Sequence, residues 1–173
     1  MDSQDGIVML AEEVLKADSM HPTDLEQVLA IERVSFIAPW SRAAFEEELA
    51  NRHSRLIVFR IHWRIVGYMC FWQVMDEAHL LNIAVLPDMR RAGLGKSMME
   101  HLEAVCRETG LKRILLDVAR RNTAARRLYK KCGFRSIGFR KKYYPEAEDD
   151  ALVMEKWLSS VIDEDSPSEE QSS

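Results

Sequence analysis

The sequence has few of the residues that form disulfide bonds or bind a metal ion in a small protein. Only three cysteines occur among 173 residues, at positions 70, 106 and 132. Because they are odd in number, widely spaced and set in apolar patterns, we expect reduced core thiols in a cytoplasmic protein. Neither Cys-x-x-Cys nor His-Glu-x-x-His occurs, and the five histidines are scattered. We therefore expect no metal site.

Long hydrophobic runs and an excess of positive charge are also lacking. No apolar run approaches the roughly 20 residues that span a bilayer, so we expect no membrane association. The N-terminus is acidic and has no long apolar region, which argues against a signal peptide. The formal net charge is −4, and it becomes +1 without residues 159–173, which hold five acidic residues and no basic one. Such a balance provides no field for direct nucleic-acid binding.

What is present fits a single globular domain. The chain is 47% hydrophobic and has the length of one domain. We expect a flexible N-terminal extension over 1–10, a folded domain over 11–158 and a disordered acidic tail over 159–173.

Hydrophobic periodicity predicts an alternation of strands and helices. Helical patterns occupy 23–36, 41–49, 94–109 and 122–132, and strand patterns occupy 11–19 (which also fits a helical turn), 55–62, 65–75, 80–86, 111–118, 134–144 and 151–158. The order is β-α-α-β-β-β-α-β-α-β-β. It indicates an α+β fold with a mixed sheet, not a regular βαβ series. An acidic turn is expected over 145–150.

Several residues mark the ends of these helices. Thr23 and Glu26 have the spacing of a capping box, and Ser41 is placed to cap the second helix. Gly110 and Gly133 are expected to end the two later helices.

Residues 80–110 combine three elements in a row. The apolar run 80–86, broken only by Asn82, predicts a buried strand. The loop 90–96 then supplies two glycines, two arginines and a lysine, and a helix with an apolar face follows it. Free amides and the helix dipole attract anions to a helix N-terminus. The stretch therefore predicts a phosphate-bearing ligand.

Three glycine motifs compete for this loop. A nucleotide-binding P-loop needs a glycine where Arg90 stands, and a dinucleotide fingerprint starting at Gly93 needs one where Met98 stands. Both patterns fail. What fits is R-x-x-G-x-G over 90–95, after an apolar strand and at the start of a helix. This motif resembles the acyl-CoA pyrophosphate loop of the GNAT acetyltransferase superfamily.

The surrounding blocks extend the resemblance over about residues 12–158. These blocks are APWS, DEAHLLNIAVLPDMRRAGLGKSMMEHLE, LLDVARRNTAARRLYKKCGF and KKYYPEAEDDALVMEKWL. Together they resemble the RimI-type members, which acetylate the alanine terminus of a small-subunit ribosomal protein. The resemblance implies the GNAT fold, a mostly antiparallel sheet of six to seven strands with about four helices. It also implies acetyl-CoA as donor and a protein or peptide N-terminus, such as a ribosomal protein's, as acceptor.

The resemblance places the cofactor contacts on a strand, on the glycine loop and on one asparagine. Backbone groups of the strand would face the pantetheine arm, loop amides would hold the pyrophosphate, and an asparagine would contact CoA: Ile83, Ala84, Val85, Arg91, Ala92, Gly93, Leu94, Gly95, Lys96 and Asn122. Asparagine is equally suited to cap the helix that starts there.

Two further residues carry the proton transfers that the resemblance implies. Tyr129 occupies the tyrosine of the A-x-x-L-Y-x-x-x-G-F block and would protonate the leaving thiolate. Asp117 stands where the RimI pattern has a glutamate that acts as base. Because aspartate is one methylene shorter, a water relay is favoured. Glu77 is the alternative carboxylate.

The acceptor side is less clearly marked. Tyr143 and Tyr144 resemble the family's YYP segment, which lines the acceptor groove, and Glu77 is placed to attract a basic peptide terminus. The acidic turn 148–150 has the same charge, although such turns are usually solvated. Two other functions stay open: a lysine or small-amine acetyltransferase on this fold, and a non-catalytic CoA-binding module.

Overall fold

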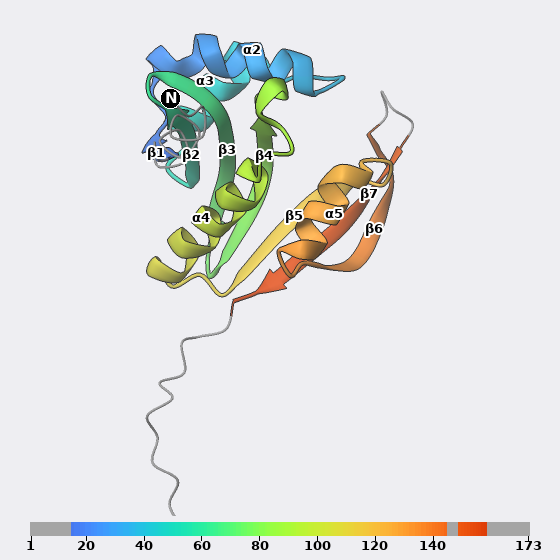
Figure 1. Cartoon of the computed structure of the whole chain (residues 1–173). Helices are drawn as coiled ribbons and strands as arrows, with labels where there is room; N and C mark the ends of the chain where they lie inside the picture. The colour runs from blue at the N-terminus through green and yellow to red at the C-terminus, as the bar shows by residue number, and fades with distance from the viewer. Residues whose placement is uncertain (1–14, 145–148, 159–173) are drawn as a thin grey trace, which may run out of the picture.

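Seven strands and four α-helices make up the part of the chain that the computed structural model describes, residues 15–144 and 149–158 (Figure 1). The strands are β1 (Lys16–Ser19), β2 (Ser54–Ile61), β3 (Arg64–Val74), β4 (Glu77–Val85), β5 (Arg113–Ala119), β6 (Arg135–Tyr144) and β7 (Asp149–Trp157). The helices are α2 (Leu25–Ser35), α3 (Arg42–Ala50), α4 (Leu94–Glu108) and α5 (Thr123–Lys131), with 3₁₀ turns η1 (Pro22–Asp24) and η2 (Pro87–Met89). The predicted element order is confirmed.

The strands form one mixed sheet in the order β1-β2-β3-β4-β5-β7-β6. Every neighbouring pair is antiparallel except β4 and β5, which run parallel. The α+β expectation, with six to seven mostly antiparallel strands and about four helices, is therefore confirmed. Among the described residues, no helix is both long and apolar enough to cross a membrane.

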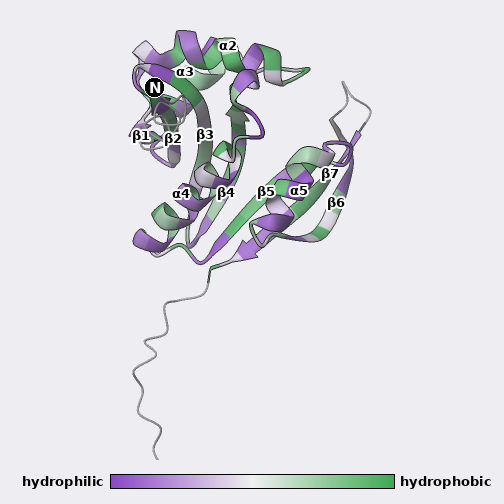
Figure 2. Cartoon of the chain, in the orientation of Figure 1, coloured by the Kyte–Doolittle hydropathy of each residue, from purple (hydrophilic) through white to green (hydrophobic). Residues whose placement is uncertain are grey.

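Two apolar clusters cover the two faces of the sheet unequally. One cluster packs α4 and α5 against strands from β2 to β7, with Leu102 and Ile114 fully buried in it. The other packs α2 and α3 only against β2, β3 and β4. Figure 2 shows the hydrophobic colour along β3 and β5. The sheet face that α2 and α3 cover thus loses its helical cover beyond β4.

The start of the first helix differs from the prediction. The capping box of Thr23 and Glu26 is wrong, because the chain enters α2 through the 3₁₀ turn η1. The carboxylate of Asp24 accepts from the amide of His21 at 2.8 Å and from the guanidinium of Arg60 at 2.7 Å. The cap at Ser41 is confirmed, since its hydroxyl oxygen accepts from the amide of Ala44 at 3.1 Å.

The ends of the later elements also hold corrections. Asp149 and Asp150 belong to β7 instead of an acidic turn, and Asp149 is buried and accepts from the amide of Arg121 at 3.0 Å. The rest of that turn, 145–148, lies outside the described residues, as do the expected extension over 1–10 and tail over 159–173. In the predicted strand 111–118, the apolar run predicts that Leu115 is buried, but it is only partly buried, because it lies on the face opposite Ile114 and Leu116.

The glycine stops are confirmed: Gly110 and Gly133 both have positive φ, at 75° and 91°. All three cysteines are free, and two of them are fully buried. Burial raises the pKa of the Cys70 thiol to about 12 and that of the Cys106 thiol to about 11. These two therefore match the expected reduced core thiols, whereas Cys132 is only partly buried.

Candidate active site

The parallel pair β4 and β5 diverges part-way along its length. The strands pair only from Glu77 with Arg113 to Leu80 with Leu116. Past that point β4 continues to Val85 in pairing with β3, while β5 continues to Ala119 in pairing with β7. Figure 1 shows the two strands spreading apart toward the ends where each ladder runs on alone. One side of each strand's backbone thus faces this divergence.

A bulge in β4 sets which side chains face each side of the sheet. Cys70 pairs with Asn82 and Phe71 with Leu80, so Leu81 is an extra residue. Such a bulge resets the alternation of side chains. Leu80 packs in the α4 cluster, whereas Asn82 is buried toward α2. The bulge thus accounts for the one polar residue in the predicted apolar strand.

Asn82 reaches a buried carboxylate on α2. Glu32 is 1% exposed. It accepts from the amide of Trp40 at 2.9 Å, from the side chain of Asn82 at 3.0 Å and from the hydroxyl of Tyr68. Burial raises the pKa of Tyr68, and the Glu32 carboxylate raises it further. Glu32 thereby ties α2 to β3, to β4 and to the segment that leads into α3.

Sequence reasoning missed Glu32, although a signal for it exists. On α2 the positions 25, 28, 29 and 32 lie on one helical face. The first three are fully or almost fully buried apolar residues, so a glutamate at the fourth is a charge on an apolar face. A buried charge is expected only with several partners. That rule would have identified it.

The glycine loop has the backbone of an anion site. Arg91 and Gly93 have φ of 65° and 80°, in the left-handed region. The first helical bond of α4 runs from the amide of Ser97 to the carbonyl of Gly93 at 3.1 Å. The amides of residues 94–96 come before it, at the positive end of a 15-residue helix. The start of α4 thus has the free amides that the predicted phosphate site requires.

The basic side chains near this loop make specific contacts. Arg90 donates from Nε to the carbonyl of Val85 and from its terminal nitrogen to the hydroxyl of Ser35, both at 3.0 Å. Arg90 thus ties the loop to the end of β4 and to α2. Lys96 lies 3.8 Å from Glu100, one turn along, and both side chains are well exposed. A Cβ added at Gly95 would lie 2.9 Å from Leu128, so this glycine lets α5 approach α4 closely.

Asp117 faces a small cavity at the point where β4 and β5 part. The cavity has a volume of about 120 Å³ and is lined by His79, Leu80, Leu81, Leu115, Leu116, Asp117, Arg140 and Val153. The carboxyl side chain of Asp117 is 26% exposed, and its oxygen lies 4.0 Å from Nε of Arg140. A carboxylate in this setting can contact both solvent and a ligand in the cavity.

Tyr129 lies on the other side of the sheet. It is buried in the α4 and α5 cluster, with its ring centroid 5.9 Å from that of Phe134. Leu116 and Val118 of β5 belong to this cluster, and Asp117 alternates with them. The two predicted proton-transfer residues therefore lie on opposite faces of the sheet.

Asn122 caps α5, as one of its two predicted roles requires. Its side-chain oxygen accepts from the amide of Ala125 at 3.2 Å. Beside it lies a hollow of about 380 Å³ lined by Arg120, Arg121, Arg126, Asp149 and Asp150. Tyr143 and Tyr144 belong to β6 by their backbone, but their side chains lie outside the described part of the chain.

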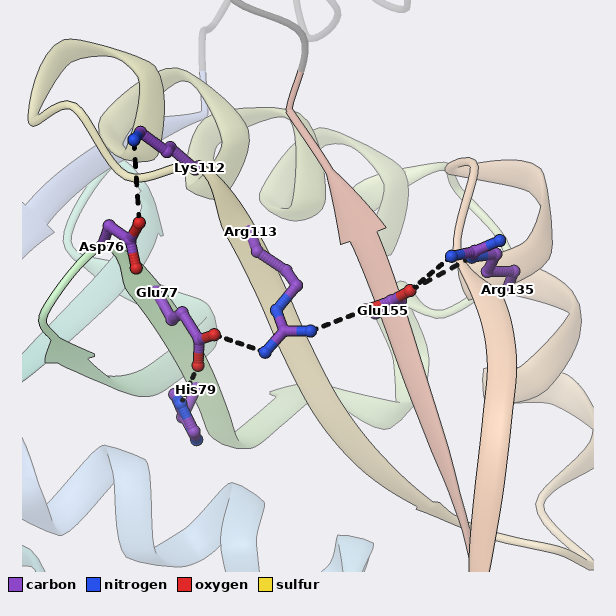
Figure 3. A network of polar contacts seen from close by, with 7 residues as sticks. All are labelled: Asp76, Glu77, His79, Lys112, Arg113, Arg135 and Glu155. Carbon is purple, nitrogen blue, oxygen red and sulfur yellow. Dashed lines mark hydrogen bonds and ion pairs between the residues drawn. The ribbon is translucent and has the colours of Figure 1, made fainter.

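Glu77 belongs to a chain of charges across four strands (Figure 3). Its carboxylate is hydrogen-bonded to Arg113, and Arg113 also donates to Glu155 at 3.1 Å. Arg135 on β6 donates to the same Glu155 at 2.8 Å. Burial works to raise the pKa of Glu77, but the bonds from Arg113 and His79 outweigh it, and the pKa is lowered. Glu77 is thus an ionised group held in place, not a loose carboxylate in the cavity.

The comparison with known protein families bears directly on this geometry. Residues 25–134 match the model of the acetyltransferase (GNAT) family. The chain belongs to this family. As a GNAT protein it is an acetyl-CoA-dependent N-acetyltransferase, which confirms the predicted fold and enzyme class.

Relatives of known name are similar over most of their length. The [ribosomal protein bS18]-alanine N-acetyltransferase of Escherichia coli K12 is 34% identical, covering 79% of this chain and 93% of that protein. The Salmonella typhimurium enzyme of the same name is 36% identical, covering 76% and 90%. These findings confirm the resemblance to RimI-type GNAT enzymes.

Solved structures agree with the sequence comparison. The crystal structure of the ribosomal-protein-S18-alanine N-acetyltransferase from Escherichia coli superposes with a TM-score of 0.78 at 31% identity. It covers 84% of this GNAT chain and 95% of its own. Ard1 from Thermoplasma volcanium also reaches 0.78, at 25% identity, with coverage of 84% and 98%.

Proposed function

We propose that this GNAT enzyme transfers an acetyl group to the α-amine of a protein that begins with alanine, with a ribosomal protein of the bS18 type as its natural acceptor. The observation that carries the proposal is the diverging β4 and β5 with Asp117 and Tyr129 on opposite faces. The names of the relatives supply the acceptor class. We therefore propose that the enzyme acts in the cytoplasm, where such an acceptor occurs.

The chain offers a matching set of groups for acetyl-CoA. The amides of residues 91–96 at the start of α4 are suited to the pyrophosphate, with Asn122 and its neighbouring arginines adding polar contacts. The backbone of Ile83, Ala84 and Val85, on the side not paired with β3, is suited to the pantetheine arm. Bound there, acetyl-CoA supplies the activated acetyl group.

The proton transfers fall to side chains of this chain. A protein α-amine has an ordinary pKa of about 8, so it must lose a proton to attack at neutral pH. Asp117, directly or through a water molecule, is the proposed base. Tyr129, buried on the opposite face, is the proposed acid for the leaving thiolate. Because these two groups account for the proton transfers, we propose a reaction without a metal.

The acceptor is proposed to lie under the segment between α2 and α3. Phe36 and Ile37 in this segment are 37% and 80% exposed and offer apolar surface to an acceptor. The bond from Trp40 to Glu32 fixes the far end of the segment. We propose that Tyr143 and Tyr144 form the opposite wall and that Glu77 adds negative charge for a basic acceptor.

A peptide panel tests this function. The enzyme is incubated with acetyl-CoA and peptides that start with alanine, with matched peptides whose α-amine is blocked but which carry lysine, and with small amines. Mass spectrometry should find acetyl only on the free α-amine of alanine peptides. Acetylation of lysine or small amines alone would establish the second function, and binding of CoA without any turnover would establish a non-catalytic module.

The variant Asp117→Asn tests the base in the same assay. Loss of a positioned base should lower kcat by about tenfold or more with the KM for acetyl-CoA unchanged. Since the side chain is partly exposed and the replacement is isosteric, the melting temperature should stay the same. An unchanged kcat would transfer the role to another group at the cavity.

A further inference from the structure

His79 faces the same cavity as Asp117. Both side chains line it, and the imidazole is 38% exposed. The partner of His79 in β5 is Leu115, two residues before Asp117. Two residues along a strand span about 7 Å, so both side chains can contact one water molecule or one amine between them.

Glu77 orients the imidazole ring. Nε2 of His79 lies 3.1 Å from one carboxylate oxygen of Glu77, while the other oxygen is bonded to Arg113. Figure 3 shows the ring of His79 on the side of Glu77 away from Arg113. Because the pKa of Glu77 is lowered, its carboxylate accepts, and Nε2 therefore carries the hydrogen. Nδ1 is then left as the basic nitrogen of the neutral ring.

The chemistry of the reaction favours such a group. The acceptor α-amine has an ordinary pKa of about 8, an imidazole one of about 6.5 and an aspartic acid one of about 4. A base is most effective when its pKa is near the operating pH, so imidazole is the better matched final acceptor. Asp117 is also engaged by Arg140, which suits it for holding a water molecule.

We propose that His79 is a second catalytic base of this enzyme, with Glu77 as its positioning residue. The neutral amine nitrogen forms the new bond to the acetyl carbon, the carbon–sulfur bond breaks, and sulfur leaves with its electron pair and takes a proton from Tyr129, which then regains one from solvent. The surplus proton of the nitrogen passes, through a water molecule held by Asp117, to Nδ1 of His79. The imidazolium then releases it to solvent. This inference rests on the acetyl transfer proposed above.

Several charges act on His79 from the elements around it. Glu77 and Asp117 stabilise the imidazolium, whereas Arg113 and Arg140 oppose it. On the β3 side its partner is Trp72, whose ring nitrogen donates to Glu48 of α3 at 2.8 Å. Removing the negative charge of Glu77 should therefore disfavour the imidazolium.

The pH profile of kcat/KM tests the role of His79. In His79→Gln, kcat should fall by about tenfold or more, and the acid limb of the profile should lose one ionisation and keep that of the acceptor amine, while the KM for acetyl-CoA stays constant. In Glu77→Gln the acid limb should move to lower pH. The matched control is His53→Gln, an exposed histidine before β2, which should behave like the wild type. A wild-type rate and profile in His79→Gln would overturn the proposal.

A spectroscopic measurement tests the role of His79 without depending on the identity of the acceptor. Nitrogen-15 NMR of the histidine rings, assigned by the loss of one signal in His79→Gln, should show hydrogen on Nε2 and a titration that moves down in Glu77→Gln. Hydrogen on Nδ1, or no titration between about pH 5 and 8, would overturn it. If the wild type does not acetylate alanine peptides but the His79 ring behaves as expected, the proposed acceptor is wrong. The rates of the variants are then measured with the amine that the enzyme does acetylate.

Discussion

The two halves of the sheet place a carboxylate in opposite environments. In the half from β1 to β4, helices cover both faces, and the carboxylate Glu32 is buried with three donors. In the half formed by β5, β7 and β6, helices pack on one face only, and the carboxylate Asp117 is partly exposed beside one guanidinium. A buried carboxylate whose oxygens all accept hydrogen bonds stabilises the fold and has no free oxygen for a ligand. One with room beside it can exchange a proton.

The halves meet at a short parallel ladder and a clasp of charges. Four residue pairs join β4 to β5. The clasp of Glu77, Arg113, Glu155 and Arg135 crosses from β4 to β6 on the face that α2 and α3 leave open. The site therefore forms where a packed half and an open half are joined only at one end.

The largest expected effect lies in the packed half. Glu32→Ala should lower the free energy of unfolding by about 3 kcal/mol, because buried donors on Tyr68 and Asn82 lose a charged acceptor. Thermal melting should report a fall of about 6 to 12 °C. The matched control is Glu46→Ala, an exposed glutamate on α3, which should melt like the wild type. An equal melting temperature for both variants would remove the contrast between the halves.

The next effect appears in activity alone. Tyr129→Phe removes the proposed acid while keeping the ring that packs against Phe134. Turnover should fall by about 100-fold, since positioned acid catalysis is typically worth this much or more. Calorimetry should find the affinity for CoA retained. Unchanged turnover would remove Tyr129 from the chemistry.

A smaller effect distinguishes backbone strain from packing. Gly93→Ala should cost about 1 kcal/mol of stability, because Gly93 has φ of 80° and a Cβ there meets nothing within 4 Å. Denaturant unfolding measures it. Gly138→Ala in the open half also meets nothing, but without positive φ, and should not lose stability. A similar loss at both sites would show that strain is not the cause.

The smallest effect concerns the clasp. Hydrogen bonding from Arg135 lowers the pKa of Glu155 despite its burial, and the pKa of Glu77 is lowered as well. Lowered carboxyl pKa values give stability that is present above their ordinary value near 4.5 and is lost as the pH falls through the folded-state values. In the double variant E77Q/E155Q, melting should therefore depend less on pH below about 4.5. If the wild type still melts higher than the double variant by the same amount at low pH, the clasp does not have this role.

Much of this architecture is encoded locally. The order of strands and helices, the cap at Ser41 and the stops at Gly110 and Gly133 follow from periodicity and backbone preference, which act over a few residues. The glycine spacing over 90–95 likewise predicts a CoA loop from local sequence, because the loop and the helix of such a site follow each other in the chain.

Other features needed the tertiary structure. The bulge at Leu81 turns Asn82 toward Glu32, which is 50 residues away in sequence, and no local pattern specifies that contact. Asp149 was expected in an acidic turn, but it is buried and accepts a hydrogen bond from the amide of Arg121, in the turn after the neighbouring strand β5. His79 lines the Asp117 cavity only because β4 and β5 are parallel neighbours at that point. The sequence by itself determined the order of the elements and the backbone of the glycine loop, since these depend on near neighbours. The tertiary structure decided that Glu32 is buried with three hydrogen-bond donors and that Asp117 is partly exposed, since burial depends on contacts between distant segments.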